Sequence, residues 1–295
     1  MSPSSTLFDS DFLSRLEALE LVARRLLRGG YRGEHNSRQW GRSLDFADFR
    51  RYQPGDDLRY VDWNIYSRLE RLFLKLFAAE EDLTLHVLVD GSASMGFGEP
   101  LKFDYARRLA AALTYVASNR MDRVLLNTFR SSLELLGDAI RCKRQMRAAL
   151  EALGRLACGG PTHLAEACRT FAAKTRYPGV VVVISDLLGD ESACDALRLL
   201  SRRGHDCVLV HLLSEDDIEP LLEGPLRLVD AETGAALNLS IDSDSRDAYR
   251  RRLQQRLSAL ESHCRRLRIE YLRVSTALPF EDVVLKYLRE GRLFA

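Results

Sequence analysis

The chain has 295 residues, 46% of them hydrophobic, so it is long enough for one large domain or two with a sizeable core. Its formal net charge is +1 at pH 7, which gives no electrostatic reason to expect nucleic acid or an anionic membrane as partner. The longest apolar runs are of strand length, well short of the roughly 20 residues of a membrane span. The N-terminus has neither the basic start nor the apolar core of a signal peptide, and six scattered cysteines without a C-x-x-C pair indicate reduced thiols. We therefore expect a cytoplasmic protein without a membrane span or a nucleic-acid partner.

The first 80 residues are predicted to differ from the rest. Residues 11–28 place leucines and other apolar residues at helical spacing, and a glycine pair at 29–30 ends that helix. Residues 31–80 are dense in charged and aromatic residues, and a strand-like stretch lies at 72–77. We predict a boundary near residue 80, with the helix and the charged, aromatic block over 1–80 and a second domain over 81–295.

From residue 83 onward, strands and helices alternate. Strands are expected at 83–90, 123–129, 179–185, 206–213 and 269–274, with a short edge strand at 132–136. Helices are expected at 101–119, 142–154, 163–175, 191–203 and 244–267, and again beyond 279. This alternation is typical of an open, mostly parallel, doubly wound α/β sheet with helices on both faces. Two apolar stretches on either side of a turn ending at Gly234 predict a hairpin inserted near 214–242.

Carboxyl and hydroxyl side chains gather where strands of this sheet should end. The apolar run 83–89 stops at Asp-Gly-Ser-Ala-Ser over residues 90–94, the run 180–184 stops just before a second aspartate, and a threonine follows the glycines at 159–160. In an open parallel sheet, ligands bind at the carboxyl ends of strands near the point where the strand order reverses. Oxygen is the ligand that Mg²⁺ prefers. Helix capping would explain the two serines but neither the threonine nor the second aspartate. The predicted metal site consists of Asp90, Ser92, Ser94, Thr162 and Asp186.

This set resembles the metal-ion-dependent adhesion site of von Willebrand factor A domains, whose pattern is D-x-S-x-S, then a distal Thr, then a distal Asp. The resemblance implies that Ser92 and Ser94 ligate the metal directly, and that Thr162 does so directly or through water. It implies that Asp90 and Asp186 contact the metal directly or through ordered waters. Mg²⁺ is the expected metal, with Mn²⁺ or Ca²⁺ as alternatives. A carboxylate from a partner protein would complete the shell.

A second motif precedes the sheet. Residues 50–63 read R-R-Y-Q-P-G-D-D-L-R-Y-V-D-W, and this string ahead of a von Willebrand A core resembles the bacterial domain-of-unknown-function 58 (DUF58) family. The resemblance implies an adaptor that acts with a MoxR-type AAA+ ATPase. Many members carry two N-terminal membrane helices, which are not expected in this chain. Charges of opposite sign nearly cancel over 41–75, which favours an internal salt-bridge network over a docking surface, with Trp63 in a core.

Two functions of different classes are consistent with these motifs. The favoured one is a non-catalytic, Mg²⁺-dependent protein-binding adaptor. The alternative is a serine hydrolase, because Ser94 stands at a strand-to-helix turn and is followed in the chain by Asp186 and then by His205 and His211. His211 lies inside an apolar strand run, where a histidine is more often a packed core residue than a base.

Overall fold

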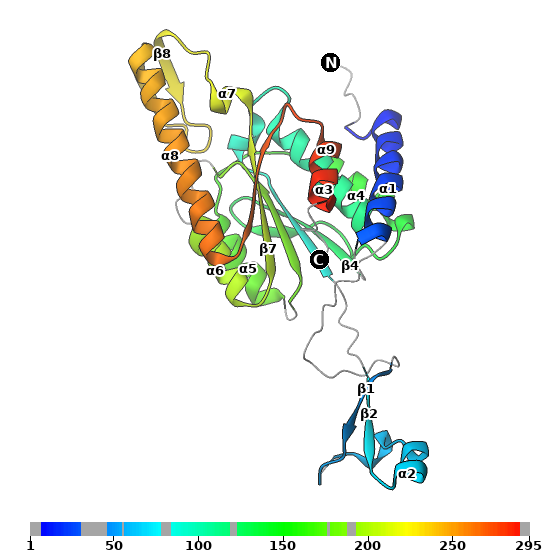
Figure 1. Ribbon diagram of the computed structural model, residues 1–295. Coiled ribbons are helices and arrows are strands. Elements are labelled where there is room, and N and C mark those ends of the chain that lie inside the picture. The colour runs from blue at the N-terminus through cyan, green and yellow to red at the C-terminus, as the bar shows by residue number, and fades with distance from the viewer. Residues whose placement is uncertain are drawn as a thin grey trace. The chain divides into compact units, whose positions relative to one another are not determined.

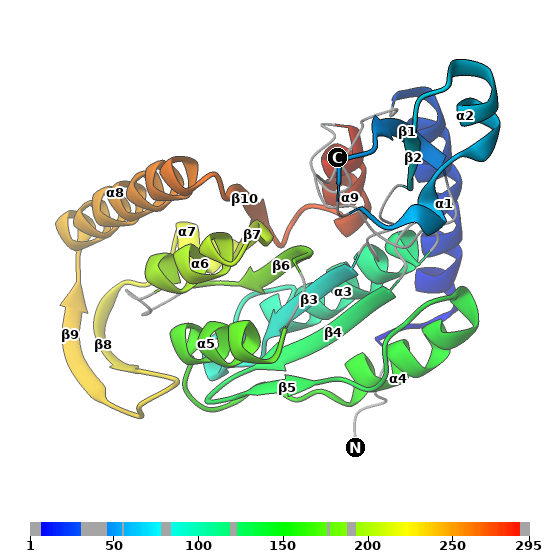
Figure 2. The ribbon, with the colours of Figure 1, turned by 90° about the horizontal axis from the view of Figure 1, so that it is seen from below.

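The computed structural model describes residues 7–30, 46–54, 56–77, 84–118, 123–175, 178–187 and 193–289. The chain divides into two compact units, one formed by Met1–Tyr31 with Leu83–Ala295 and the other by Arg32–Asp82. The larger unit is built on a six-stranded sheet (Figure 1). The strand order is β10-β7-β6-β3-β4-β5, which can be followed in Figure 2.

The sheet of the larger unit is parallel except at one edge. Its strands are β3 (Thr84–Asp90), β4 (Arg123–Phe129), β5 (Leu133–Leu135), β6 (Val180–Ser185), β7 (Asp206–Leu213) and β10 (Glu270–Ser275). Only β5 runs antiparallel to its neighbour, β4, among the strands of this sheet that the structure describes. Every residue of β3 is buried, as expected for a strand covered on both faces. The predicted open, mostly parallel, doubly wound α/β sheet is confirmed.

Helices cover both faces of the sheet (Figure 2). One face is covered by α1 (Ser10–Gly30), α3 (Lys102–Ala117), α4 (Met146–Arg155) and α9 (Phe280–Arg289), whose apolar side chains form one core with the sheet. The other is covered by α5 (Leu164–Lys174), α6 (Ala193–Arg202) and α8 (Ser243–Leu267), which form a second core. The helices described here lack the combination of length and apolar character that crossing a bilayer requires.

Helix α1 belongs to the core of the larger unit, so the structure departs from the predicted division at residue 80. Phe12, Leu16 and Leu19 of α1 are each at most 3% exposed. The ring centroid of Phe12 lies 5.2 Å from that of Phe280 in α9. Helical periodicity reveals an apolar stripe but not the element that covers it, and here that element lies near the other end of the sequence.

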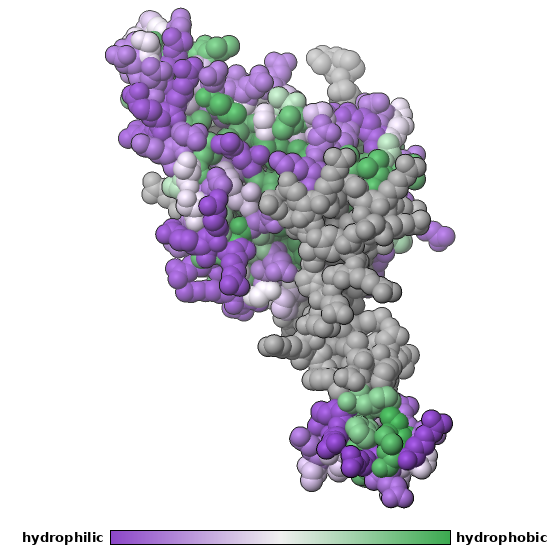
Figure 3. Space-filling model, viewed as in Figure 1, coloured by the Kyte–Doolittle hydropathy of each residue, from purple (hydrophilic) through white to green (hydrophobic). Residues whose placement is uncertain are grey.

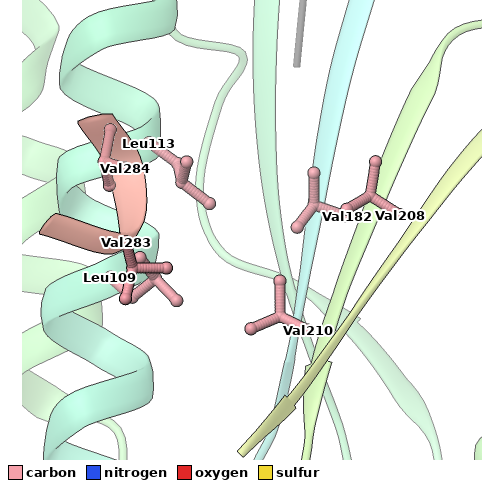
Figure 4. Close-up of a pocket in the computed structure, with 7 residues that line it drawn as sticks. All are labelled: Leu109, Leu113, Val182, Val208, Val210, Val283 and Val284. Atoms are coloured by element: carbon pink, nitrogen blue, oxygen red, sulfur yellow. The ribbon is translucent and has the colours of Figure 1, made fainter. Parts of the chain in front are cut away.

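A small apolar cavity lies between the helices and the sheet (Figure 4). Its volume is about 10 Å³, close to the smallest that can hold a water molecule. Aliphatic side chains from α3, β6, β7 and α9 line it: Leu109, Leu113, Val182, Val208, Val210, Val283 and Val284. Because these side chains offer water no hydrogen-bond partner, the cavity is a packing defect and not a binding site.

A hairpin is inserted between β7 and α8, where the sequence predicts one. It consists of β8 (Gly224–Val229) and β9 (Ala236–Ile241), paired antiparallel. A short helix, α7 (Glu215–Ile218), precedes it. Leu228, Val229 and Leu237 are between 39% and 63% exposed, so these strands stay largely outside the two cores.

The smaller unit pairs β1 (Phe46–Arg51) antiparallel with β2 (Phe73–Phe77), with a single turn η1 (Leu58–Tyr60) and helix α2 (Trp63–Leu69) between them. Ion pairs within it join Arg50 to Asp56, Arg59 to Asp57 and Lys75 to Asp62.

The prediction that Trp63 is a core residue is wrong. Its side chain is 60% exposed and makes an edge-on contact with Tyr66, with 6.1 Å between ring centroids. Trp63 is the first residue of α2, directly after the capping residue Asp62. Figure 3 shows apolar residues among hydrophilic ones on the surface of this unit.

Candidate metal centre

The carboxyl ends of two neighbouring strands bring Asp90 and Asp186 to the same edge of the sheet. After β3 the chain continues to β4 on one side, and it later returns to β6 on the other side of β3. The strand order therefore reverses at β3, which is where open α/β sheets form their ligand crevice. Asp90, at the end of β3, is 0% exposed, and Asp186, directly after β6, is 1% exposed. Two carboxylates are thus held at the predicted place, largely shielded from water.

The two serines join these carboxylates in one oxygen cluster. The loop and the 3₁₀ turn η2 (Ala93–Gly96) after β3 carry Ser92 and Ser94. The backbone N–H of Ser92 donates to Asp90 Oδ1 at 2.9 Å, and the two serine Oγ atoms lie 3.0 Å apart. Ser94 Oγ donates to Asp186 Oδ1 at 3.2 Å. Ser92 makes no side-chain capping bond to η2, so helix capping does not account for its position.

Thr162 lies on a loop that is bonded to the serine loop, but its side chain faces another group. Gly159 N–H donates to Gly91 O at 2.8 Å, and Ala93 N–H donates to Gly160 O at 2.9 Å. The Thr162 hydroxyl donates to a carboxylate oxygen of Glu232, on the hairpin turn, at 2.8 Å. Four of the five predicted residues therefore form one cluster, and the fifth stands beside it.

A cavity of about 510 Å³ opens between this cluster and the hairpin. Its lining comes from the serine loop, α3, the threonine loop, α7 and the hairpin turn: Ser94, Phe97, Lys102, Thr162, Asp217, Val229, Asp230, Ala231, Glu232 and Thr233. The half-buried Ser94 is the member of the oxygen cluster that reaches this space. The site is thus accessible from one side.

Lys102 is a residue of the site that the sequence analysis missed. Its Nζ lies 2.8 Å from Asp186 Oδ2 and 3.1 Å from Asp217 Oδ2, and the side chains of Lys102 and Asp186 are each 1% exposed. Burial disfavours the charged form, but the two carboxylates outweigh it and raise the pKa of Lys102 above its usual value. A signal was present, because a lysine in the first turn of a helix is unfavourable beside the helix dipole unless a tertiary partner holds it.

Asp217 is held in place by its own helix end. Ser214 Oγ accepts a hydrogen bond from the Asp217 N–H, and Asp217 Oδ2 accepts one from the Ser214 N–H at 2.9 Å, a reciprocal cap of α7. The Tyr249 hydroxyl donates to the Asp217 carbonyl at 2.6 Å. This cap fixes the position of the Asp217 carboxylate, which is the second of the two carboxylates paired with Lys102.

The donor set fits a hard divalent cation by its chemistry. The Ser94 hydroxyl contacts both the Ser92 hydroxyl and the Asp186 carboxylate, and oxygens of these kinds are the ligands that such a cation prefers. Burial raises the pKa of Asp90 to about 7, a hydrogen bond from Ser185 opposes the rise, and the Asp186 charge adds to it. A nearby cation would oppose this rise in the pKa of Asp90, because it favours the charged carboxylate. Within the described ranges no three His, Cys, Asp or Glu side chains are grouped as metal ligands, so a cation here would depend on the hydroxyls.

The residues that would form a hydrolase triad with Ser94 do not come together as one. His211 Nε2 bonds to the Asp186 carbonyl and Nδ1 to the Tyr271 hydroxyl, each at 2.8 Å, and burial lowers the pKa of this histidine to about 4. His205 Nδ1 lies 3.3 Å from the Gly179 carbonyl, at the amino edge of the sheet, opposite the edge that carries Ser94. Neither histidine is paired with Ser94 as a general base would be.

Gly98, in the loop between η2 and α3, should be intolerant of a side chain. Its φ is +95°, and a Cβ there would lie 2.5 Å from Ser214 Cβ. The added group would displace Ser214, the N-cap residue of α7 whose hydrogen bonds hold Asp217. We expect Gly98→Ala to lower the free energy of unfolding by about 1–3 kcal/mol through backbone strain and by about 1–3 kcal/mol more through the clash.

Gly137→Ala is the matched control, because Gly137 has a φ of +80° with no atom within 4 Å of the added Cβ. Urea titrations should show that Gly98→Ala lowers the free energy of unfolding more than Gly137→Ala does. Equal losses would mean that Ser214 moves aside without effect.

The relatives found by sequence are uncharacterized proteins, and the solved structures that align with this chain share little of its sequence. The uncharacterized proteins Rv1480 of Mycobacterium tuberculosis and Mb1516 of Mycobacterium bovis are each 29% identical over 248 residues, which is 82% of this chain and 78% of theirs. The structure of the conserved hypothetical protein BatB from Bacteroides thetaiotaomicron aligns with 12% identity and a TM-score of 0.46, over 72% of this chain and 98% of that one. The SpRpn10 VWA domain aligns with 15% identity and a TM-score of 0.42, over 69% and 94%.

A family match agrees with the resemblance found in the sequence. The family described as "Protein of unknown function DUF58" matches residues 48–258, which is well over half of the chain. The match includes the whole upstream motif at 50–63 and the whole set of predicted metal-site residues. This chain belongs to the DUF58 family.

Proposed function

We propose that this protein is a non-catalytic, Mg²⁺-dependent protein-binding module that serves as an adaptor for a MoxR-type AAA+ ATPase. The observation that carries the proposal is the contact between Ser92, Ser94 and Asp186 at the point where the strand order reverses. The choice of ATPase rests on the family resemblance alone.

The chain's own groups have distinct roles in this proposal. Ser92 and Ser94 present hydroxyl oxygens, while Asp90 and Asp186 supply negative charge from the buried side. The Lys102 ammonium binds one oxygen of Asp186 and leaves Oδ1 facing Ser94. A bound Mg²⁺ would supply a positive charge that attracts a carboxylate from the partner. Phe97, which lines the same cavity and is 56% exposed, offers that partner an apolar contact.

The test is affinity capture from native lysate with tagged protein, in Mg²⁺ and in EDTA. Wild type should recover a specific partner in Mg²⁺ only, and Ser94→Ala should recover none, because it removes a hydroxyl of the cluster and nothing from the core. Ser132→Ala, which changes an exposed serine outside the cluster, is the matched control and should behave as wild type.

The partner should then be identified and tested as a purified protein, with a MoxR-type AAA+ ATPase from the same organism as the first candidate. Recovery that is equal for Ser94→Ala and wild type, or equal with and without Mg²⁺, would place the contact away from this site and end the proposal.

A further inference from the structure

The hairpin turn delivers a carboxylate to the predicted metal site from within the chain. Glu232 Oε1 accepts a hydrogen bond from the Thr162 hydroxyl at 2.8 Å, and Oε2 accepts one from the Thr162 N–H at 3.0 Å. Both side chains are half-buried. A two-point contact between a carboxylate and two adjacent donors fixes orientation as well as distance. Both donors of Thr162 are therefore occupied by an acidic side chain 70 residues away in the sequence.

The turn that carries Glu232 is itself ordered by hydrogen bonds. Asp230 Oδ1 accepts from the N–H groups of Glu232, at 2.8 Å, and of Thr233, at 3.1 Å. Gly234 N–H donates to the Asp230 carbonyl at 2.9 Å. These bonds hold the backbone around Glu232, so little conformational freedom is lost when its carboxylate binds Thr162.

The hairpin as a whole is lightly anchored. Three apolar side chains of its strands, Leu228, Val229 and Leu237, are exposed. The Glu223–Arg246 ion pair, at its base, is 71% exposed on the glutamate side, where solvent weakens such pairs. An element of this kind can move as a body when a polar contact at its tip is exchanged.

We propose that Glu232 is an internal acidic ligand of this site, which a partner's carboxylate must displace. The inference rests on the proposed function, since the displaced position matters only if a partner binds there. The cavity is lined by Ser94 and Thr162 on one side and by the hairpin turn on the other. Only one carboxylate at a time can accept hydrogen bonds from both the N–H and the hydroxyl of Thr162. The same contact indicates the chemistry of the partner, which is an exposed Asp or Glu on a turn.

The contact is tested first in metal-free protein, through hydrogen exchange of the Thr162 amide followed by NMR. Glu232→Gln should speed this exchange at least tenfold, because an amide side chain cannot offer two acceptor oxygens to the two donors. Glu223→Gln, which removes an acid at the base of the hairpin, should leave it unchanged. Equal exchange in wild type and Glu232→Gln would overturn the inference.

The second readout is the affinity for Mn²⁺ alone, measured by the loss of the free-ion EPR signal. Thr162 is a predicted metal ligand, and a carboxylate that accepts a hydrogen bond from its hydroxyl should strengthen metal binding. Glu232→Gln should therefore weaken Mn²⁺ binding about tenfold. Unchanged Mn²⁺ affinity would show that Glu232 is not a ligand of the site. If Ser94→Ala binds Mn²⁺ as tightly as wild type, the metal-site proposal fails, and Thr162 exchange still decides whether the hairpin contact exists.

Competition is tested with the partner recovered by affinity capture, at a Mg²⁺ concentration that saturates both wild type and Glu232→Gln. Glu232→Gln should bind it several-fold more tightly than wild type, since no internal carboxylate then has to leave. Equal or weaker binding would overturn the displacement.

Discussion

Replacing Asp186 with alanine should lower the free energy of unfolding by about 3–5 kcal/mol, because it leaves a buried charge without one of its partners. Lys102 Nζ lies 2.8 Å from Asp186 Oδ2, and both side chains are 1% exposed. After the substitution the ammonium would keep only Asp217, at 3.1 Å. Urea unfolding followed by circular dichroism measures the loss.

Two further variants separate the ion pair from the rest of the site. Ser94→Ala removes one hydroxyl that donates to Asp186 at 3.2 Å and should cost about 1 kcal/mol. Lys102→Met, added to Asp186→Ala, should recover part of the stability, because the unpaired charge is removed as well. A loss below 1 kcal/mol for Asp186→Ala would mean that water or another group neutralises the lysine. Ser94→Ala is therefore the cleaner variant for binding experiments.

Replacing Lys102 with methionine should make the stability of the fold depend on a divalent cation. Without the ammonium, the buried Asp186 and the nearby Asp217 lose their shared counter-charge, and Asp90 adds a further carboxylate to the cluster. We expect a lower melting temperature in EDTA and partial recovery in Mg²⁺. At a concentration 100-fold above the dissociation constant, a ligand that binds only the folded state adds about 2.7 kcal/mol. Thermal unfolding in EDTA and in Mg²⁺ measures both effects.

Lys143→Met is the control, since it also removes a lysine that is paired with a carboxylate, here that of Glu20, outside the oxygen cluster. That variant should gain no more from Mg²⁺ than wild type does. A gain of the same size in both variants, or in neither, would argue against a cation site at the end of β3.

The part of the site that could be predicted is the part encoded locally. Asp90, Ser92 and Ser94 lie within five residues directly after an apolar run, and Asp186 follows another run. Parallel strands bring such ends together whatever the details of packing, so the pattern specified the cluster. The same periodicity gave the strands and most of the helices.

The partners of that cluster depend on packing that no local pattern records. Lys102 lies 84 residues from Asp186, and Glu232 lies 70 residues from Thr162. A lysine in a first turn and a glutamate in a hairpin turn are both common on protein surfaces. The packing of α3 against the sheet brings Lys102 to the site, and the approach of the hairpin turn brings Glu232 to it. Trp63 was misplaced for a related reason, because residue type predicts burial only on average.

The contact between α1 and α9 has a consequence for the order of folding. The two helices share one core although they come from distant parts of the sequence, and Arg32–Asp82 is inserted between α1 and the first strand of the sheet. During synthesis the inserted unit is complete by residue 82, whereas α1 has no α9 to pack on until translation has passed residue 280. The apolar stripe of α1 therefore stays uncovered on that side while the sheet is made, an interval in which a chaperone would have a binding site.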